Sequence, residues 1–341
     1  MGFFDIIKGK SYDNWGISLD IGTEFVKTAI FEVKDGSAIV KGYGFQRQKL
    51  SDMQGGVVTD IAGVVKNCEH ALEIAAKTAQ VLPFKVVIGI AGELVKGTTT
   101  NIKYTRQNSK ANLTVEELKG IVEKVQAQSF ERARKILAWE TGHAEIDVKL
   151  VNAAIVDVKI DGYKVTNPIG FQGKEVEIGV YNAFAPIVHL GALQTISEEL
   201  DFDLLSVAAE PYAVARAVAE EEAIDFSAII LDIGGGTTDM AVVRNGGVEG
   251  TKMFGIGGRA FTKRISQLLG IPFSQAETKK IDYSQGKIHH KEELEKIKDA
   301  IKEDIKVWFL GIILTLEEFK NVDLLPSKIL LCGGASQLPE I

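Results

Sequence analysis

The stretch Ala228–Val243 reads AIILDIGGGTTDMAVV and decides the fold. An apolar, β-branched run ends at Asp232, and a second apolar run begins shortly after it, which predicts a hairpin of two buried strands. Backbone glycines allow close approach to a ligand and direct N–H groups into one concavity, and hydroxyls add further donors for phosphate oxygens. The turn supplies both kinds of residue in Gly234, Gly235, Gly236, Thr237 and Thr238.

Carboxylates flank this turn at Asp232 and Asp239, and carboxylate oxygens are ligands that hydrated Mg²⁺ prefers. Taken alone, a glycine-rich hairpin is more often an ordinary turn than a phosphate site. A second copy of the pattern changes that interpretation, because Trp15–Ala29 (WGISLDIGTEFVKTA) again joins two apolar strands through a short turn. Two such loops about 210 residues apart predict two similar half-molecules facing one polyphosphate. The turn residues of the first copy are Asp20, Gly22 and Thr23.

Composition narrows the class of protein. A chain of 341 residues is long enough for two or more domains with their own cores. The net charge of −7 argues against nucleic acid as a partner, since neutralising phosphates needs a basic face. Cys68 and Cys332 lack metal-ligand spacing and are expected to stay free in a reducing cytosol. The longest apolar run, Val307–Leu316, is followed by two glutamates, which favours a buried helix over a membrane span.

Between the two glycine loops the pattern changes in character. Residues 84–177 are predicted to form a small α+β domain inserted into the first half, with a polar surface excursion at Thr98–Lys110. Thr114 and Glu117 form a capping box for a helix that runs to about Trp139. The opening residues Met1–Lys10 leave two interpretations open, an apolar tail packed on the first domain or a short membrane-surface anchor.

Glu210 and Pro211 follow a predicted strand, and proline suits the first position of a helix. Glu210 is then either a helix-cap carboxylate favoured by the macrodipole or a group that positions water at a γ-phosphate. Further on, GIGGRA opens another helix, whose N-terminus at Gly257 and Gly258 is predicted to lie near phosphates. A Rossmann site is disfavoured because no acidic residue ends a following strand in the expected place.

Two segments are candidates for the nucleoside end of a ligand. Glu277 and Lys280 follow a capping box that begins at Ser274, and they form either a surface pair or part of a ribose and base site. The last strand leads into CGGAS, whose glycines permit close approach to a flat ligand such as adenine. A helix start near Pro339 has nothing after it, so we expect the chain to be incomplete. The turn residues of CGGAS are Gly333, Gly334, Ala335 and Ser336.

Three glycine loops in this order (LDIGT, LDIGGGTTD and CGGAS), with Glu210-Pro211 between the first two, resemble the actin-like ATPase superfamily, which includes Hsp70 and the sugar kinases. The resemblance implies an α/β, ribonuclease H-like fold of two lobes that binds ATP. It also implies that Asp20 and Asp232 hold Mg²⁺ through water. Lys27 has the spacing of a phosphate-contacting lysine in actin, although an outward strand position would also explain it.

Within that superfamily the chain most resembles FtsA, the bacterial cell-division protein, with the pilus protein PilM as a close relative. The segments that carry the resemblance are AEPYAVARAV (209–218), FGIGGRAFTKRI (254–265), AETKK (276–280) and DGYKVTNPIGFQG (161–173). The resemblance implies a cytoplasmic protein at the inner face of the membrane that polymerises head to tail. It implies tethering of tubulin-like division filaments, and contacts with other division proteins through an SHS2-like insert. The C-terminal amphipathic helix that tethers FtsA is not found in these residues.

The resulting division assigns residues 13–83 and 178–205 to the first lobe and 84–177 to the insert. It assigns 206–246 and 322–341 to the second-lobe core, and 247–321 to a second-lobe subdomain. Any ATPase activity is expected to be weak, with Glu210 orienting the attacking water and Asp232 holding the metal. A PilM-like scaffold and a small-molecule kinase of the same superfamily are the alternatives, and the kinase would need a substrate-side aspartate base.

Overall fold

The computed structural model describes residues 13–92, 95–142, 146–218, 226–319 and 324–341. The strands are β1 (Trp15–Ile21), β2 (Phe25–Lys34), β3 (Ser37–Arg47), β4 (Met53–Gln54), β5 (Val57–Val58), β6 (Lys85–Ile90), β7 (Lys96–Thr105), β8 (Val148–Ile160), β9 (Tyr163–Lys164), β10 (Glu175–Pro186), β11 (Asp203–Ala209), β12 (Ala228–Ile233), β13 (Thr238–Arg244), β14 (Gly247–Phe254) and β15 (Ile329–Cys332). The helices are α2 (Ile61–Ala79), α3 (Val115–Thr141), α4 (Ile187–Glu199), α5 (Glu210–Val218), α6 (Gly258–Leu269), α7 (Phe273–Ser284) and α8 (Lys291–Glu317), with a 3₁₀ turn η1 (Gly334–Gln337).

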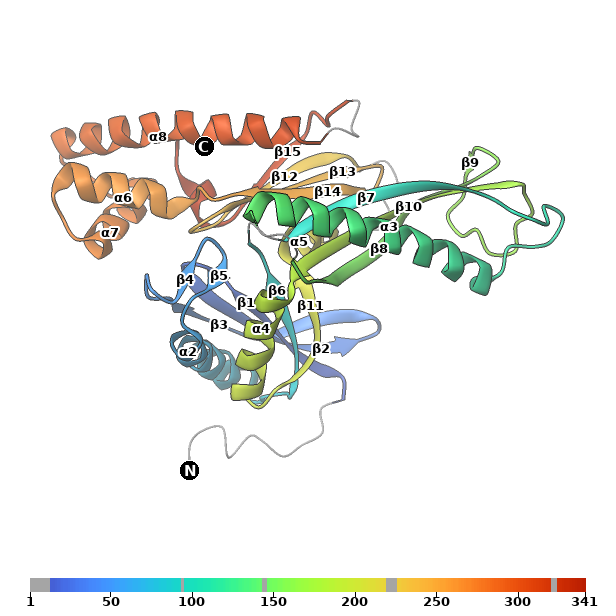
Figure 1. The fold of residues 1–341 in the computed structure, drawn as a ribbon. Helices are drawn as coiled ribbons and strands as arrows, with labels where there is room; N and C mark the ends of the chain where they lie inside the picture. The colour runs from blue at the N-terminus through green and yellow to red at the C-terminus, as the bar shows by residue number, and fades with distance from the viewer. Residues whose placement is uncertain (1–12, 93–94, 143–145, 219–225, 320–323) are drawn as a thin grey trace.

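The first lobe is a five-stranded sheet in the order β11-β6-β1-β2-β3, with α2 and α4 packed on it (Figure 1). Its core consists of alternating apolar residues of the strands, Ile17 and Leu19 among them. Helix α2 begins at Asp60, whose side chain accepts a hydrogen bond from the N–H of Gly63 at 3.1 Å. The helix lies close against β3 because Gly42 and Gly44 have no side chains to hold it away.

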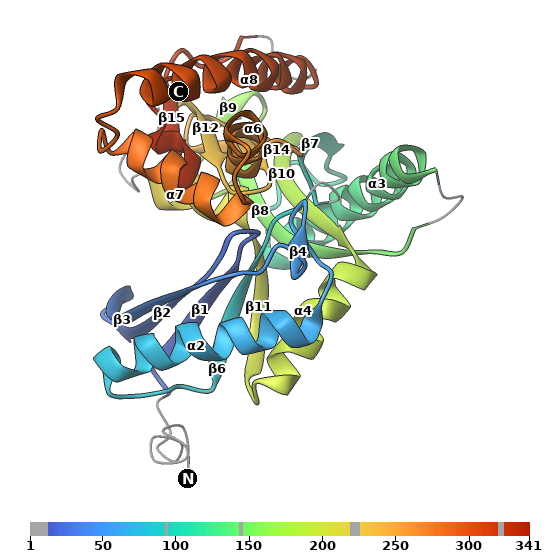
Figure 2. The same cartoon turned by 90° about the vertical axis from the view of Figure 1, so that its left-hand side faces the viewer.

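The second sheet runs continuously through β15-β12-β13-β14-β7-β10-β8-β9. We call β12–β15 with α6, α7, α8 and η1 the second lobe, and β7–β10 with α3 the insert. In the second lobe α8 lies over the sheet, and α6 and α7 pack against α8 beyond the ends of the strands (Figures 1 and 2). Phe261, Ile265 and Trp308 are buried in the core that these helices share with the sheet.

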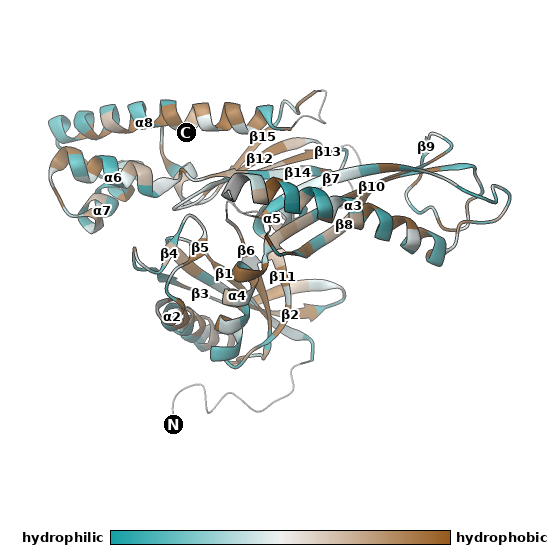
Figure 3. Cartoon of the chain, in the orientation of Figure 1, coloured by the Kyte–Doolittle hydropathy of each residue, from teal (hydrophilic) through white to brown (hydrophobic). Residues whose placement is uncertain are grey.

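Helix α8 becomes more apolar toward its C-terminal half (Figure 3). The prediction that the run Val307–Leu316 is a buried helix is wrong in part. Trp308 and Ile312 are buried, whereas Val307, Phe309, Leu310 and Leu314 are more than half exposed.

The insert differs from the prediction in three places. The first is its end, because β10 runs past the predicted boundary at residue 177 and pairs with β7 and β8 to Phe184 and beyond, so the assignment of this strand to the first lobe is wrong. The predicted boundary at residue 84 is wrong for β6, which pairs in parallel with β1 and β11 in the first lobe. The predicted surface excursion Thr98–Lys110 is also wrong, because most of it is strand β7, paired along its length with β10. Its threonines alternate between the two faces of the sheet, and the buried Thr99 hydroxyl donates to the Val248 carbonyl at 2.5 Å. The four-part division of the chain otherwise stays a prediction.

Helix α3 begins as predicted at Thr114, whose hydroxyl accepts a hydrogen bond from the N–H of Glu117 at 3.2 Å. The Glu117 carboxylate, which would complete a capping box by turning back to the helix start, pairs with buried Arg106 at 2.8–2.9 Å. Arg106 also donates to the carbonyls of Ala111 and Gly173. One guanidinium therefore ties the loop before α3 to the loop before β10.

Other predictions concern the ends and the cysteines. Cys68 and Cys332 are both free thiols, as expected. None of the helices in the described part of the chain combines the length and apolarity that crossing a bilayer requires. The segment Met1–Lys10 lies outside the described residues.

The contact between β3 and α2 gives a prediction for stability. A Cβ on Gly44 would lie 2.0 Å from the carbonyl oxygen of Ala71, so Gly44→Ala should lower the free energy of unfolding by at least about 3 kcal/mol. A Cβ added to Gly120, in α3, would have no atom within 4 Å, so Gly120→Ala should raise the free energy of unfolding by about 0.5–1 kcal/mol. Chemical denaturation followed by circular dichroism measures both. An unchanged midpoint for Gly44→Ala would contradict the packing of α2.

Candidate functional site

A cavity of about 330 Å³ lies between the two lobes. The turn between β1 and β2, the turn between β12 and β13, the first residues of α5 and α6, helix α7 and η1 all contribute to its wall. The predicted residues that line it are Asp20, Gly22, Thr23, Lys27, Glu210, Asp232, Gly234, Gly235, Thr237, Gly258, Glu277, Lys280, Gly333, Gly334 and Ala335. The predicted residues outside this lining are Gly236, Thr238, Gly257 and Ser336.

The two glycine loops contact each other across the lobes. A Cβ on Gly235 would lie 2.7 Å from the Cβ of Glu24, and one on Gly236 would lie 2.9 Å from the Thr23 side chain. Real side chains do not tolerate such distances, so these glycines are required for the lobes to approach. The sequence predicts that the glycines serve close approach of a ligand, and in the structure Gly236 serves the contact between loops instead.

The N-terminus of α6 supports the second loop from behind. The N–H of Gly258 donates to the carbonyl of Gly234 at 2.9 Å, and the N–H of Arg259 donates to that of Gly235 at 2.7 Å. A Cβ on Gly257 would lie 2.7 Å from the Gly234 carbonyl oxygen, which explains the glycine at that position. The N–H groups of Gly258 and Arg259 therefore hold the second loop in place, and the proximity of this helix N-terminus to phosphates stays a prediction.

Two hydroxyls predicted to face a ligand have other partners. Thr238 is fully buried, donates to the carbonyl of Ile256 at 2.7 Å and accepts from the indole N–H of Trp308 at 2.9 Å. Ser336 donates to the carbonyl of Gly333 at 2.7 Å within the η1 turn. Both hydroxyls therefore fix loop geometry rather than face the cavity.

Four carboxylates gather at the phosphate end of the cavity, on Asp20, Glu210, Asp232 and Asp239. Lys27 lies directly across the strand pair from Asp20, and its ammonium forms an ion pair with that carboxylate at 2.8 Å. This register places Lys27 in the cavity wall and explains its seven-residue spacing from Asp20.

Burial raises the pKa of Glu210 well above its usual range, and the charges of Asp20 and the second-loop aspartates add to the effect. Burial also raises the pKa of Asp239 from 3.8 to about 7, with Asp232 as the next cause. The pKa of Asp232 is raised by burial and opposed by Lys27. For Lys27, burial acts to lower the pKa, but Asp20 outweighs it and the pKa is raised. A bound cation would relieve this accumulation of negative charge.

The donor set fits magnesium. Asp20 and Asp232 offer only oxygen atoms, which Mg²⁺ prefers over nitrogen or sulfur. Within the described ranges, no three His, Cys, Asp or Glu side chains converge closely enough to enclose a metal ion by themselves. Such a site suits an ion that keeps several waters and takes further oxygens from a phosphate ligand.

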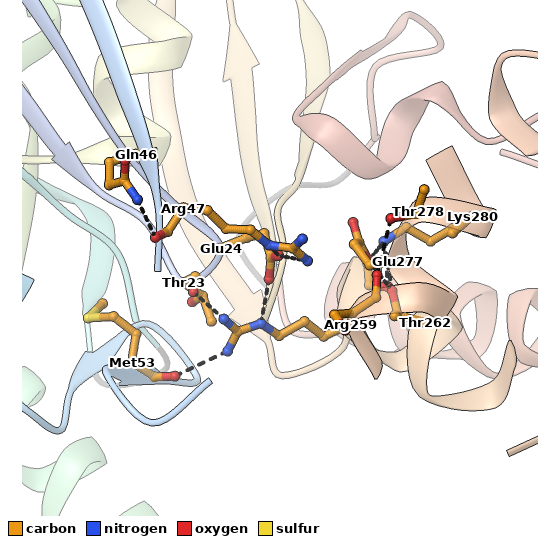
Figure 4. A network of polar contacts seen from close by, with 12 residues as sticks. Thr23, Glu24, Gln46, Arg47, Met53, Arg259, Thr262, Glu277, Thr278 and Lys280 are labelled. Atoms are coloured by element: carbon orange, nitrogen blue, oxygen red, sulfur yellow. Dashed lines mark hydrogen bonds and ion pairs between the residues drawn. The ribbon is translucent and has the colours of Figure 1, made fainter. Parts of the chain in front are cut away.

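At the other end of the cavity, the interpretation of Glu277 and Lys280 as a surface pair is wrong. Both are buried, and they form an ion pair at 2.8 Å (Figure 4). The ammonium of Lys280 also donates to the carbonyl of Gly258 at 3.0 Å and to the hydroxyl of Thr262 at 2.9 Å. Helix α7 begins at Phe273 with Pro272 as its N-cap, two residues earlier than a capping box at Ser274 predicts.

The η1 turn closes the cavity beside the second loop. Gly333 has φ +85°, and a Cβ on it would lie 2.4 Å from the Oδ1 atom of Asp232. Only glycine satisfies both constraints, so the CGGAS motif brings a backbone segment directly against the carboxylate of Asp232.

Sequence reasoning missed an ion-pair network across the lobes (Figure 4). The guanidinium of Arg259 donates to Glu24 Oε2 at 2.7 Å, to the carbonyl of Thr23 at 2.6 Å and to that of Met53 at 3.3 Å. Arg47 donates to the other oxygen of Glu24 at 2.7 Å. The signal that could have found it is the pair of opposite charges at Glu24, directly after the first glycine loop, and at Arg259, directly after the glycines that open α6.

Two lobes that present paired glycine loops to a shared cavity define the actin-like class. Solved structures confirm this fold. The "PilM-PilN type IV pilus biogenesis complex" matches 95% of this chain and 82% of its own, with a TM-score of 0.66 and 18% identity. MreB 5 of Spiroplasma citri bound to AMPPNP matches 96% and 87%, with a TM-score of 0.51 and 14% identity.

Sequence comparison narrows the class further. Residues 229–341 match the family model of the cell division protein FtsA. FtsA of Neisseria meningitidis is 28% identical over 266 residues, which cover 78% of this chain and 60% of the relative. FtsA of Streptococcus pneumoniae is 24% identical over 339 residues, covering 94% and 70%. The chain is similar to these FtsA proteins and has the actin-like fold, and it spans roughly three fifths to seven tenths of the length of these relatives.

The buried carboxylate of Asp239 predicts a pH dependence of stability. Its raised pKa means that the folded protein holds the proton more tightly than the unfolded chain, so stability is lost through this group as pH rises from about 4 to about 7. In the ligand-free protein with chelator, Asp239→Asn should raise the Tm at about pH 8 and raise it less at about pH 5. Asp299→Asn, on the exposed face of α8, is the control and should change neither value. Equal shifts at the two pH values would refute the assignment.

Proposed function

We propose that the chain binds ATP with Mg²⁺ in the cavity between the lobes. The observation that carries the proposal is the convergence of acidic and glycine-rich segments from both lobes on one cavity, with Asp20 and Lys27 on one side and Asp232 on the other. The similarity to FtsA supports the same function. Because ATP would contact both lobes, it binds the closed form more tightly and shifts the population toward it.

The residues that line the cavity have different proposed roles toward the ligand. The ammonium of Lys27 contacts phosphate oxygens, and Asp20 and Asp232 hold the metal through its waters. The bound ion supplies neutralisation of the phosphate charge. Glu210, at the cavity wall beside the second loop, is the residue proposed to orient the attacking water. We expect turnover to be slow, as suits a switch rather than a metabolic enzyme.

In the cell, we propose that the closed form polymerises head to tail and tethers tubulin-like division filaments at the inner face of the cytoplasmic membrane. The FtsA relatives support this role, and the insert is the proposed contact for other division proteins. The net charge of −7 supports protein rather than nucleic-acid partners.

Metal binding by Asp232 can be tested by titration calorimetry with ATP in the presence and absence of Mg²⁺. Wild-type protein should bind more tightly with Mg²⁺, and Asp232→Ala should lose roughly tenfold or more of that gain, since a charged metal partner is removed. Asp299→Ala is the matched control because this aspartate is exposed on α8. An Asp232→Ala protein with wild-type affinity for Mg-ATP would exclude the metal assignment.

The division role is tested by co-sedimentation with ATP, lipid vesicles and the tubulin-like GTPase, omitting each component in turn. We expect the protein to pellet only with ATP, and the GTPase to reach the vesicle fraction only with the protein present. ATP turnover stimulated by a small substrate would instead indicate a kinase. Sedimentation independent of nucleotide, with no turnover, would indicate a scaffold.

A further inference from the structure

Arg259 touches both glycine loops. Its main-chain N–H donates to the carbonyl of Gly235 in the second loop at 2.7 Å. Its guanidinium reaches across the lobes and donates to the carbonyl of Thr23 in the first loop at 2.6 Å. Any movement of one loop away from the other must therefore break a contact of this residue.

A second arginine, Arg47, fixes the position of the Glu24 carboxylate, which is the acceptor for Arg259. Glu24 gives its Oε2 atom to Arg259, at 2.7 Å, and its Oε1 atom to Arg47, at 2.6–2.7 Å. Arg47 and Glu24 are both in the first lobe, so their pair survives if the lobes separate. The contacts of Arg259 with Glu24, Thr23 and Met53 all cross between lobes and are lost together.

The ion pair between Glu24 and Arg259 is largely shielded from water, which makes it stronger than an exposed pair. The side chains of Glu24 and Arg259 are 12% and 16% exposed, unlike the pair of Arg264 with Asp304 on the same helix, where the arginine is 50% exposed. Charge-assisted hydrogen bonds shielded from water are stronger than exposed pairs. The planar guanidinium is also the group that can serve a carboxylate and two carbonyls at once.

We propose that Arg259 is a positioning residue that couples the two phosphate loops, with Glu24 as its anchor, and that it sets the rate at which nucleotide leaves. The inference rests on the proposed function, because it assigns the release step of the same site. It adds a latch formed by the protein alone, which keeps the lobes together before any nucleotide binds.

Release is measured by displacing a fluorescent ATP analogue in a stopped-flow instrument with Mg²⁺ present. Arg259→Met should speed dissociation roughly 10- to 100-fold and change association much less, because loss of one partner of a shielded charge pair acts mainly on the off-rate. Arg259→Lys keeps the charge but not the fork of donors, so it should give an intermediate rate. Arg264→Met is the matched control on α6 and should release nucleotide at the wild-type rate.

A double-mutant cycle separates the latch from a general loss of packing. Glu24→Gln combined with Arg259→Met should release nucleotide scarcely faster than Arg259→Met alone, since the two residues share one contact. Additive effects would overturn the pairing. So would a wild-type release rate in a folded Arg259→Met or Arg259→Lys protein, or an equal acceleration in Arg264→Met.

The ligand-free protein provides a readout independent of nucleotide. Small-angle scattering should show a larger radius of gyration for Arg259→Met than for wild type and for Arg264→Met. If wild-type protein fails to bind ATP yet this difference appears, the proposed function is wrong and the latch stands. If ATP binds normally and neither the scattering nor the release rate changes, the latch is wrong and the proposed function stands.

Discussion

Electrostatic repulsion within the cavity is the constraint on which the rest of the structure depends. Asp20 of the first lobe and Asp232 of the second face the same enclosed space, with Asp239 and Glu210 behind them. Burial has already pushed the pKa of Asp239 to about 7, which measures how poorly the site tolerates this charge. Lys27 balances part of this charge through its ion pair with Asp20, and further contacts hold the two lobes together.

Those contacts lie just outside the carboxylates. Glycine at positions 235 and 236 allows the loops to touch, and Arg259 joins them through Glu24 and the Thr23 carbonyl. Repulsion among the carboxylates and attraction between Arg259 and the first lobe oppose each other. A switch between two states of similar free energy requires such a balance. A bound divalent cation would weaken the repulsion among these carboxylates, whereas the contacts of Arg259 lie outside the carboxylates.

The sequence predicts the local elements of this site well and their packing poorly. Glycine loops, flanking apolar strands and the helix start at Glu210 carry their signals within a few residues, so a cavity around Asp20 and Asp232 can be predicted from local patterns. Strand β7 was missed because its polar threonines alternate within a sheet that is only partly buried. The pairing of Glu24 with Arg259 spans 235 residues, and no periodicity reports a contact of that separation.

The same lack of a local signal for long-range contacts explains why the position of the insert cannot be predicted from the sequence. Its chain enters from β6 and leaves through α4, both in the first lobe, yet its sheet is hydrogen-bonded to the second lobe. Strand β7 of the insert pairs with β14 of the second lobe at Gly250–Thr98 and Thr251–Gly97, and the Tyr181 and Thr251 hydroxyls form a hydrogen bond at 3.1 Å. A change in the angle between the lobes must therefore alter either this pairing or the region where the insert joins the first lobe. The insert is therefore hydrogen-bonded to both lobes, to the second through the pairing of β7 with β14 and to the first through Asn152 of β8, whose side-chain oxygen accepts from the N–H of Ala209 at 2.6 Å.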